Sequence, residues 1–66
     1  MAEQVEQYFR SRLGTPEDCF DVMSTMDVVE LEELQGVADG INAGGRDLEA
    51  QKRGLDWSVR IGNFIA

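Results

Sequence analysis

The side chains that could carry out chemistry are one thiol and thirteen carboxylates. Cys19 is the single cysteine, and the sequence has no histidine. A nucleophilic cysteine normally needs an adjacent base, usually histidine. Cys19 also falls on the apolar stripe of a predicted helix. We therefore interpret it as a buried structural thiol.

The carboxylates are also candidate metal ligands. Glu30 and Glu33, one helical turn apart, come nearest to a paired site for Mg²⁺ or Ca²⁺. The sequence has no aspartate-rich calcium loop, and one cysteine without histidine cannot complete a structural zinc site. Residues 42–46 also lack the spacing of a phosphate-binding loop. The sequence predicts no metal, no cofactor and no enzymatic activity.

The distribution of charge says more than its total of −7. Residues 13–45 contain eight acidic side chains and no basic one. A surface of this kind repels nucleic-acid phosphates and anionic membranes, and it attracts a basic patch on another protein. We therefore expect no direct binding to nucleic acid or membrane. The candidate residues for contact with a partner protein are Glu17, Asp21, Glu32, Glu33 and Asp39.

The central element is a predicted amphipathic helix over residues 26–45. Asp27 is a suitable N-cap, and Gly44 with Gly45 would supply the left-handed residue that ends such a helix. At 100° per residue, one apolar stripe contains Leu31, Leu34, Val37, Ala38 and Ile41.

Two further helices are predicted before it. Residues 2–13 place Val5, Tyr8, Phe9 and Leu13 on one side, and Gly14 ends the helix. Thr15 and Pro16 start a short second helix that runs to about Ser24. Its apolar stripe is Cys19, Val22, Met23 and Met26, with Phe20 at the edge.

The C-terminal segment, residues 46–65, allows two interpretations. As a helix it has two apolar stripes on roughly opposite sides, one with Leu48, Leu55 and Val59 and the other with Trp57, Ile61, Phe64 and Ile65. Residues 55–61 also alternate like a strand. We prefer the helix, because no second strand is visible to pair with this one.

A helix that is apolar on two sides must be covered on two sides. One cover is the domain's own core, and the other is predicted to be a second copy of the chain. The predicted dimer or apolar interface comprises Trp57, Ile61, Phe64 and Ile65. Gly36 and Gly40 join this set as a flat groove for another helix, or are tolerated surface glycines.

The predicted fold is all-α: a single domain, residues 1–66, of three or four short helices completed by homodimerisation. A chain of this length buries only about 60% of its unfolded surface, so a partner is a plausible source of further stability. The first nine residues lack the apolar core of a signal peptide, and no apolar run approaches the ~20 residues of a membrane span. We expect a cytoplasmic location.

In size, acidity and helical character the chain resembles small proteins that bacteriophages make to bind and disable host proteins. Some of these are anti-activators of transcription regulators, and others inhibit host machines. The resemblance implies a non-catalytic module that blocks or modulates a partner protein through its acidic helical face. The alternative is a small structural or assembly subunit that docks through its C-terminal apolar face.

Overall fold

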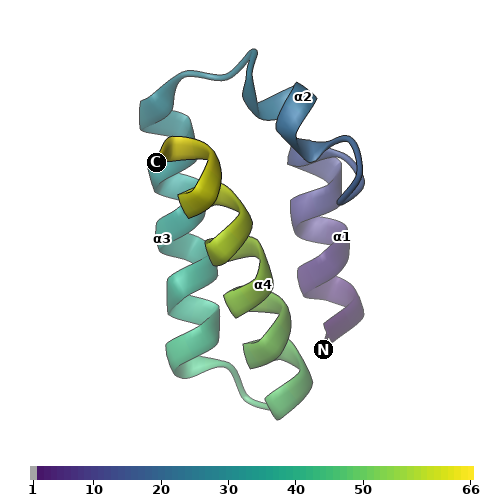
Figure 1. Ribbon diagram of the computed structural model, residues 1–66. Coiled ribbons are helices and arrows are strands. Elements are labelled where there is room, and N and C mark those ends of the chain that lie inside the picture. Colours follow the sequence, from purple (N-terminus) through teal and green to yellow (C-terminus); the bar gives the residue numbers. More distant parts are fainter. Residues whose placement is uncertain (1) are drawn as a thin grey trace.

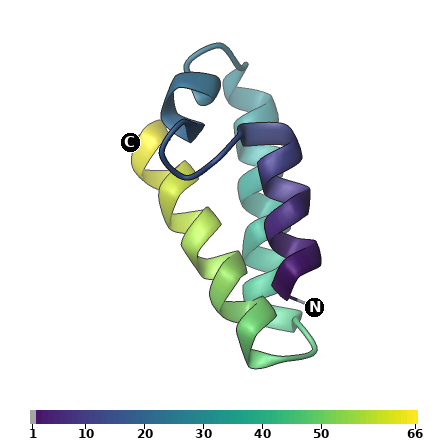
Figure 2. The same cartoon turned by 90° about the vertical axis from the view of Figure 1, so that its right-hand side faces the viewer.

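The computed structural model describes residues 2–66, which are entirely helical apart from the connections. The helices are α1 (Ala2–Leu13), α2 (Cys19–Met23), α3 (Val28–Gly44) and α4 (Leu48–Ile65). Figure 1 shows α3 and α4 as an antiparallel hairpin, with α1 beside α4. The short α2 lies across the end of the bundle where α1 finishes, as both views show (Figure 2). The all-α prediction is confirmed.

Most helix ends follow the predicted local signals. Gly14 has a φ of 81° and ends α1. The Asp27 carboxylate accepts a hydrogen bond from the Val29 backbone N–H at 3.3 Å and caps α3. Asp47, which was not among the predicted caps, caps α4 in the same way and accepts from the Ala50 N–H at 2.8 Å. These side chains satisfy N–H groups that have no partner inside their helix.

Two predicted helix ends are wrong. The second helix begins at Cys19, because residues 16–18 form a turn in which the Asp18 N–H bonds the Thr15 carbonyl. The helix α3 does not end on a left-handed residue, since Gly45 has a φ of −62°. Space explains the glycine there, because a Cβ on Gly45 would lie 2.6 Å from the Ile41 carbonyl oxygen.

The closest helix contact lies between α3 and α4 at Gly54. A Cβ on this residue would lie 2.8 Å from both the Ala38 carbonyl oxygen and the Asn42 amide nitrogen. The absence of a side chain therefore lets the two backbones meet. The helices α3 and α4 share the most extensive contact in the fold, while α1 packs against α4 and α2.

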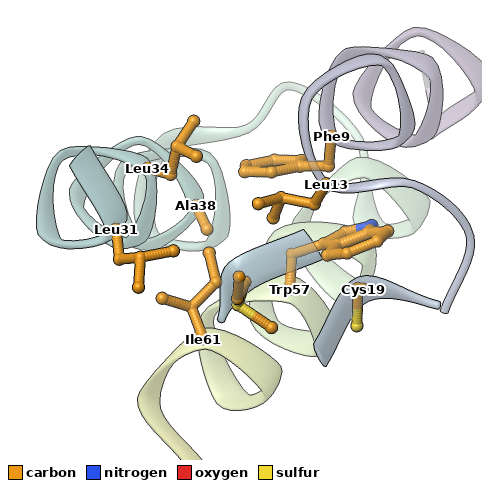
Figure 3. Close-up of a cluster of buried hydrophobic side chains, with 9 residues drawn as sticks. Phe9, Leu13, Cys19, Leu31, Leu34, Ala38, Trp57 and Ile61 are labelled. Atoms are coloured by element: carbon orange, nitrogen blue, oxygen red, sulfur yellow. The ribbon is translucent and has the colours of Figure 1, made fainter. Parts of the chain in front are cut away.

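The core gathers one stripe from each helix around Trp57 (Figure 3). Trp57 is fully buried, and its ring stacks on Phe9 with centroids 5.4 Å apart and planes 14° from parallel. The other fully or nearly fully buried members of the cluster are Leu13, Cys19, Met23, Leu31, Leu34, Ala38 and Ile61. The predicted stripes therefore supply most of the core, although Phe20, Val37 and Ile65 are 43%, 40% and 37% exposed.

The C-terminal segment is helical from Leu48 to Ile65, which confirms the preferred interpretation of residues 55–61. Trp57 and Ile61 are completely enclosed by the chain's own helices, so they offer no surface to a second chain. The exposed apolar stripe of α4 is the other one, with Leu48, Leu55 and Val59. Within the described residues, no helix is both long enough and apolar enough to cross a membrane.

The buried indole N–H is paired with a carboxylate on α1. Trp57 Nε1 donates to Glu6 Oε1 at 3.0 Å, and Arg10 Nε donates to the other oxygen, Oε2, at 2.8 Å. Partial burial acts to raise the pKa of Glu6, but these two hydrogen bonds and the positive charge of Arg10 outweigh it. The pKa of Glu6 therefore lies below its usual value, and the carboxylate is charged when it holds the indole.

The glycines of α3 and α4 should respond oppositely to alanine. We expect G54A to lower the free energy of unfolding by about 1–3 kcal/mol, because the methyl group meets backbone atoms of α3. G36A and G40A should each raise it by about 0.5–1 kcal/mol, because nothing lies within 4 Å of a Cβ at either position. Urea unfolding followed by Trp57 fluorescence measures all three. A stabilising G54A would contradict the observed helix contact.

Removing the Glu6 carboxylate should leave the buried indole N–H without an acceptor. We expect E6A to cost about 1–3 kcal/mol at pH 7, and E6Q to cost less, because the amide oxygen can still accept from Trp57. A lowered folded-state pKa stabilises the protein above the unfolded pKa, and this is lost as pH falls through the folded value. The stability difference between wild type and E6Q should therefore shrink below about pH 4. A difference that does not vary between pH 7 and pH 3 would show that the charge of Glu6 is not involved.

Candidate protein-binding groove

A groove runs between α1 and α3 on the side of the bundle away from α4. It arises because α4 packs against both helices, whereas α1 and α3 make little direct contact with each other. The space has a volume of about 500 Å³. Its lining residues are Tyr8, Arg12, Met26, Glu30, Glu33, Leu34 and Val37.

The floor of the groove is apolar and continuous with the core. Leu34 is only 8% exposed, and Tyr8 and Met26 are half-buried against the core cluster. Val37 extends the apolar surface along α3 and is more accessible. A partner side chain entering here can therefore bury apolar surface without displacing a core residue.

The two rims of the groove carry opposite charges, but no ion pair joins them. Glu30 and Glu33 project from α3, and among the described residues neither forms a hydrogen bond or an ion pair. Arg12 on the α1 rim is held on its own helix, with its guanidinium 3.8 Å from the Tyr8 ring centroid. Its Nη1 also donates to the Tyr8 carbonyl at 3.2 Å. The carboxylates on the α3 rim are therefore available to pair with basic groups of a partner.

The structure brings only one of the five predicted contact residues to this groove. Glu33 lies on the rim, but Glu32 points about 100° away around α3. Asp39 accepts a hydrogen bond from the buried Ser58 hydroxyl and so fastens α3 to α4. Glu17 and Asp21 are exposed near α2, at the end of the bundle.

Sequence reasoning missed Glu30, Tyr8 and Arg12 as residues that could contact a partner. The sequence suggested Glu30 only as half of a possible metal-binding pair. Its spacing with Glu33 and Val37, three and then four residues on, was a usable signal for a surface beside the core stripe. Nothing in the sequence of α1 indicated that Tyr8 and Arg12 lie across from this edge.

The remaining predicted interface residues occupy separate places. Phe64 is half-buried against the core, and Ile65 is partly exposed at the end of α4. Gly36 and Gly40 lie on the open side of α3 with no neighbour near them. Their predicted contact with another helix stays a prediction, since the structure contains one chain.

The titratable residues of the described chain form no metal-binding cluster of three or more side chains. Cys19 is buried, and its Sγ donates to the Pro16 carbonyl at 3.4 Å. Desolvation raises the pKa of the thiol above its usual value, which disfavours the reactive thiolate. This is the structural thiol expected from the sequence.

Comparisons of the chain with protein-family models, with curated proteins and with solved structures found no match.

Burial of Cys19 has a direct chemical consequence. We expect the thiol to react with Ellman's reagent orders of magnitude more slowly in the folded protein than in 6 M guanidinium chloride, because access requires opening of the core. The absorbance at 412 nm measures both rates. Rapid reaction of the folded protein would show that α2 does not cover this residue.

Proposed function

We propose that this protein is a non-catalytic binding module that blocks or modulates a partner protein. The observation that supports this is the groove between α1 and α3, in which an apolar floor lies beside two unpaired carboxylates. Apolar burial supplies binding free energy, and the carboxylates select a positively charged partner.

An amphipathic helix with basic residues along one side suits such a groove. Helices α1 and α3 form its two walls, so a partner helix would form a four-helix arrangement with α1, α3 and α4. Apolar side chains of the partner would contact Leu34 and Val37, and its Lys or Arg side chains would pair with Glu30 and Glu33. If these basic residues also bind nucleic acid, occupation of the groove would compete with phosphate.

The acidic residues outside the groove contribute at longer range. Glu17, Asp21 and Glu32 are exposed and add to the negative potential of a chain with net charge −7. Such a field raises the rate at which a basic partner arrives, and salt screens it. This role resembles that of the phage inhibitors and anti-activators to which the chain is similar in size and charge.

A designed peptide tests the proposal. The probe is an 18-residue helical peptide with leucines at positions i, i+3 and i+7 and lysines on one flank, and its control carries glutamates instead. We expect the lysine peptide to bind and the glutamate peptide not to, with affinity falling as salt rises. Fluorescence anisotropy at 50 and 500 mM salt measures both.

Two double variants then separate the groove from general electrostatics. E30K/E33K and E17K/E32K change the net charge equally, but only the first alters the groove rim. We expect the first to weaken binding at least about tenfold and the second no more than about threefold. Equal losses would show that charge alone, rather than the groove, recruits the peptide. No binding of the lysine peptide at low salt would contradict the proposed function.

An exposed apolar patch favours a second candidate function, that of a structural or assembly subunit. Phe20 is 43% exposed, and its ring centroid lies 6.2 Å from that of Phe64 beside the end of α4. Docking through this patch would be insensitive to salt, unlike capture of a basic segment.

We also propose that the working form is a homodimer, as the doubly apolar α4 suggests. The surface involved is distinct from the groove.

A further inference from the structure

The outer side of α4 carries an apolar stripe that the fold does not cover. Leu48, Leu55 and Val59 are 64%, 46% and 51% exposed. At 100° per residue these positions, spaced by seven and then four, fall within about 40° of one another on the side opposite Trp57 and Ile61. The stripe extends over most of a helix of 18 residues, which is about 27 Å long.

We propose that a second copy of the chain packs on this stripe, with the two α4 helices antiparallel about a two-fold axis near residues 53 and 54. In this register Leu48 lies opposite Val59 of the second copy, and the two Leu55 side chains lie close to the axis. The stripe therefore matches itself when it is reversed, as an isologous interface requires.

The charges beside the stripe also match themselves. Lys52 and Asp56 lie on the same flank of α4, about 40° apart. A two-fold axis across antiparallel helices brings equivalent flanks together, so Lys52 lies about one residue's rise from Asp56 of the second copy. The dimer thereby gains two Lys52–Asp56 pairs. Gln51 and Gly62 on the other flank are uncharged.

Charge elsewhere on the chain favours this face over others for self-association. Residues 13–45 hold an excess of eight negative charges, so two copies repel each other through α2 and α3. Helix α4 has three basic and two acidic side chains, so it approaches its own copy with less repulsion than α2 or α3 would, and it carries the exposed apolar stripe. Three apolar side chains per copy make a small interface, so we expect a dissociation constant in the micromolar range.

The dimer would leave both grooves open. The groove lies between α1 and α3, whereas the stripe lies on the outer side of α4. The two grooves then face away from the seam, which is the contact between the two α4 stripes. A partner with two basic helices can bind both grooves at once with increased avidity. Dimerisation itself does not depend on the proposed partner, so either proposal can fail alone.

Sedimentation velocity from 1 to 500 µM tests the seam. We expect wild type to shift towards twice the 7.4 kDa protomer mass as concentration rises. V59K should dimerise only at higher concentrations, with its Kd for self-association raised at least about tenfold by the buried lysine. The matched control V37K places the same change on a partly exposed valine of the groove and should leave dimerisation unchanged. Circular dichroism confirms that both variants fold. A wild type that stays monomeric at 500 µM, or equal effects of V59K and V37K, would overturn the proposal.

Mixing two charge variants tests the antiparallel register. K52D and D56K each place like charges across the seam, and each should weaken self-association about 3- to 30-fold. An equimolar mixture should recover dimers near the wild-type affinity, because K52D and D56K chains are complementary only to one another. The like charges within each helix persist in the mixture, so recovery cannot arise from an intrahelical pair. If the mixture associates no better than either variant alone, the antiparallel register is refuted.

Discussion

The fold depends on the enclosure of one indole ring. Trp57 stacks on Phe9 and donates its N–H to Glu6, so both its apolar face and its polar atom are satisfied by α1. The Arg60 guanidinium lies 5.0 Å from the ring centroid and adds a cation–π contact. The hydrogen bond to Glu6 joins residues 51 positions apart in the sequence, and together with the Phe9 stack it attaches α1 to the helical hairpin. A buried tryptophan without its acceptor would be costly, which is why a charged carboxylate is tolerated there.

Two residues of very different size on α4 explain the shape of the bundle. Gly54 allows α3 to approach until the backbones touch, whereas the broad Trp57 ring meets α1. The third edge, between α1 and α3, is left open and becomes the groove. Close packing on one side of α4 and a large side chain on the other therefore produce a binding surface without any dedicated loop.

Charge and shape have separate roles on this molecule. The acidic excess of residues 13–45 determines which partners are attracted, but it covers several directions around the chain. Only Glu30 and Glu33 combine charge with an apolar floor, and Asp39 is already engaged by Ser58. Helix α4 has little net charge and an exposed apolar stripe. The acidic surface and the apolar stripe thus suit different partners, a basic helix and a second copy.

The sequence by itself determined the helices, most of their ends and nearly the whole core. Asp27 caps its helix through a contact two residues away, and Phe9, Leu34 and Trp57 lie on apolar stripes visible from their spacing. Such features depend on neighbours within about two helical turns, so periodicity and capping rules find them. The burial of the Cys19 thiol was likewise predicted from the apolar stripe of its own helix.

Only the tertiary structure decided which flank of each helix faces a neighbour. It moved Val37 from the core to the groove, placed Trp57 and Ile61 in the core rather than at an interface, and joined Asp39 to Ser58. A helical period gives the direction of a side chain about its own axis only. The distances between axes depend on contacts such as those of Gly54 and Trp57, which link residues far apart in the sequence.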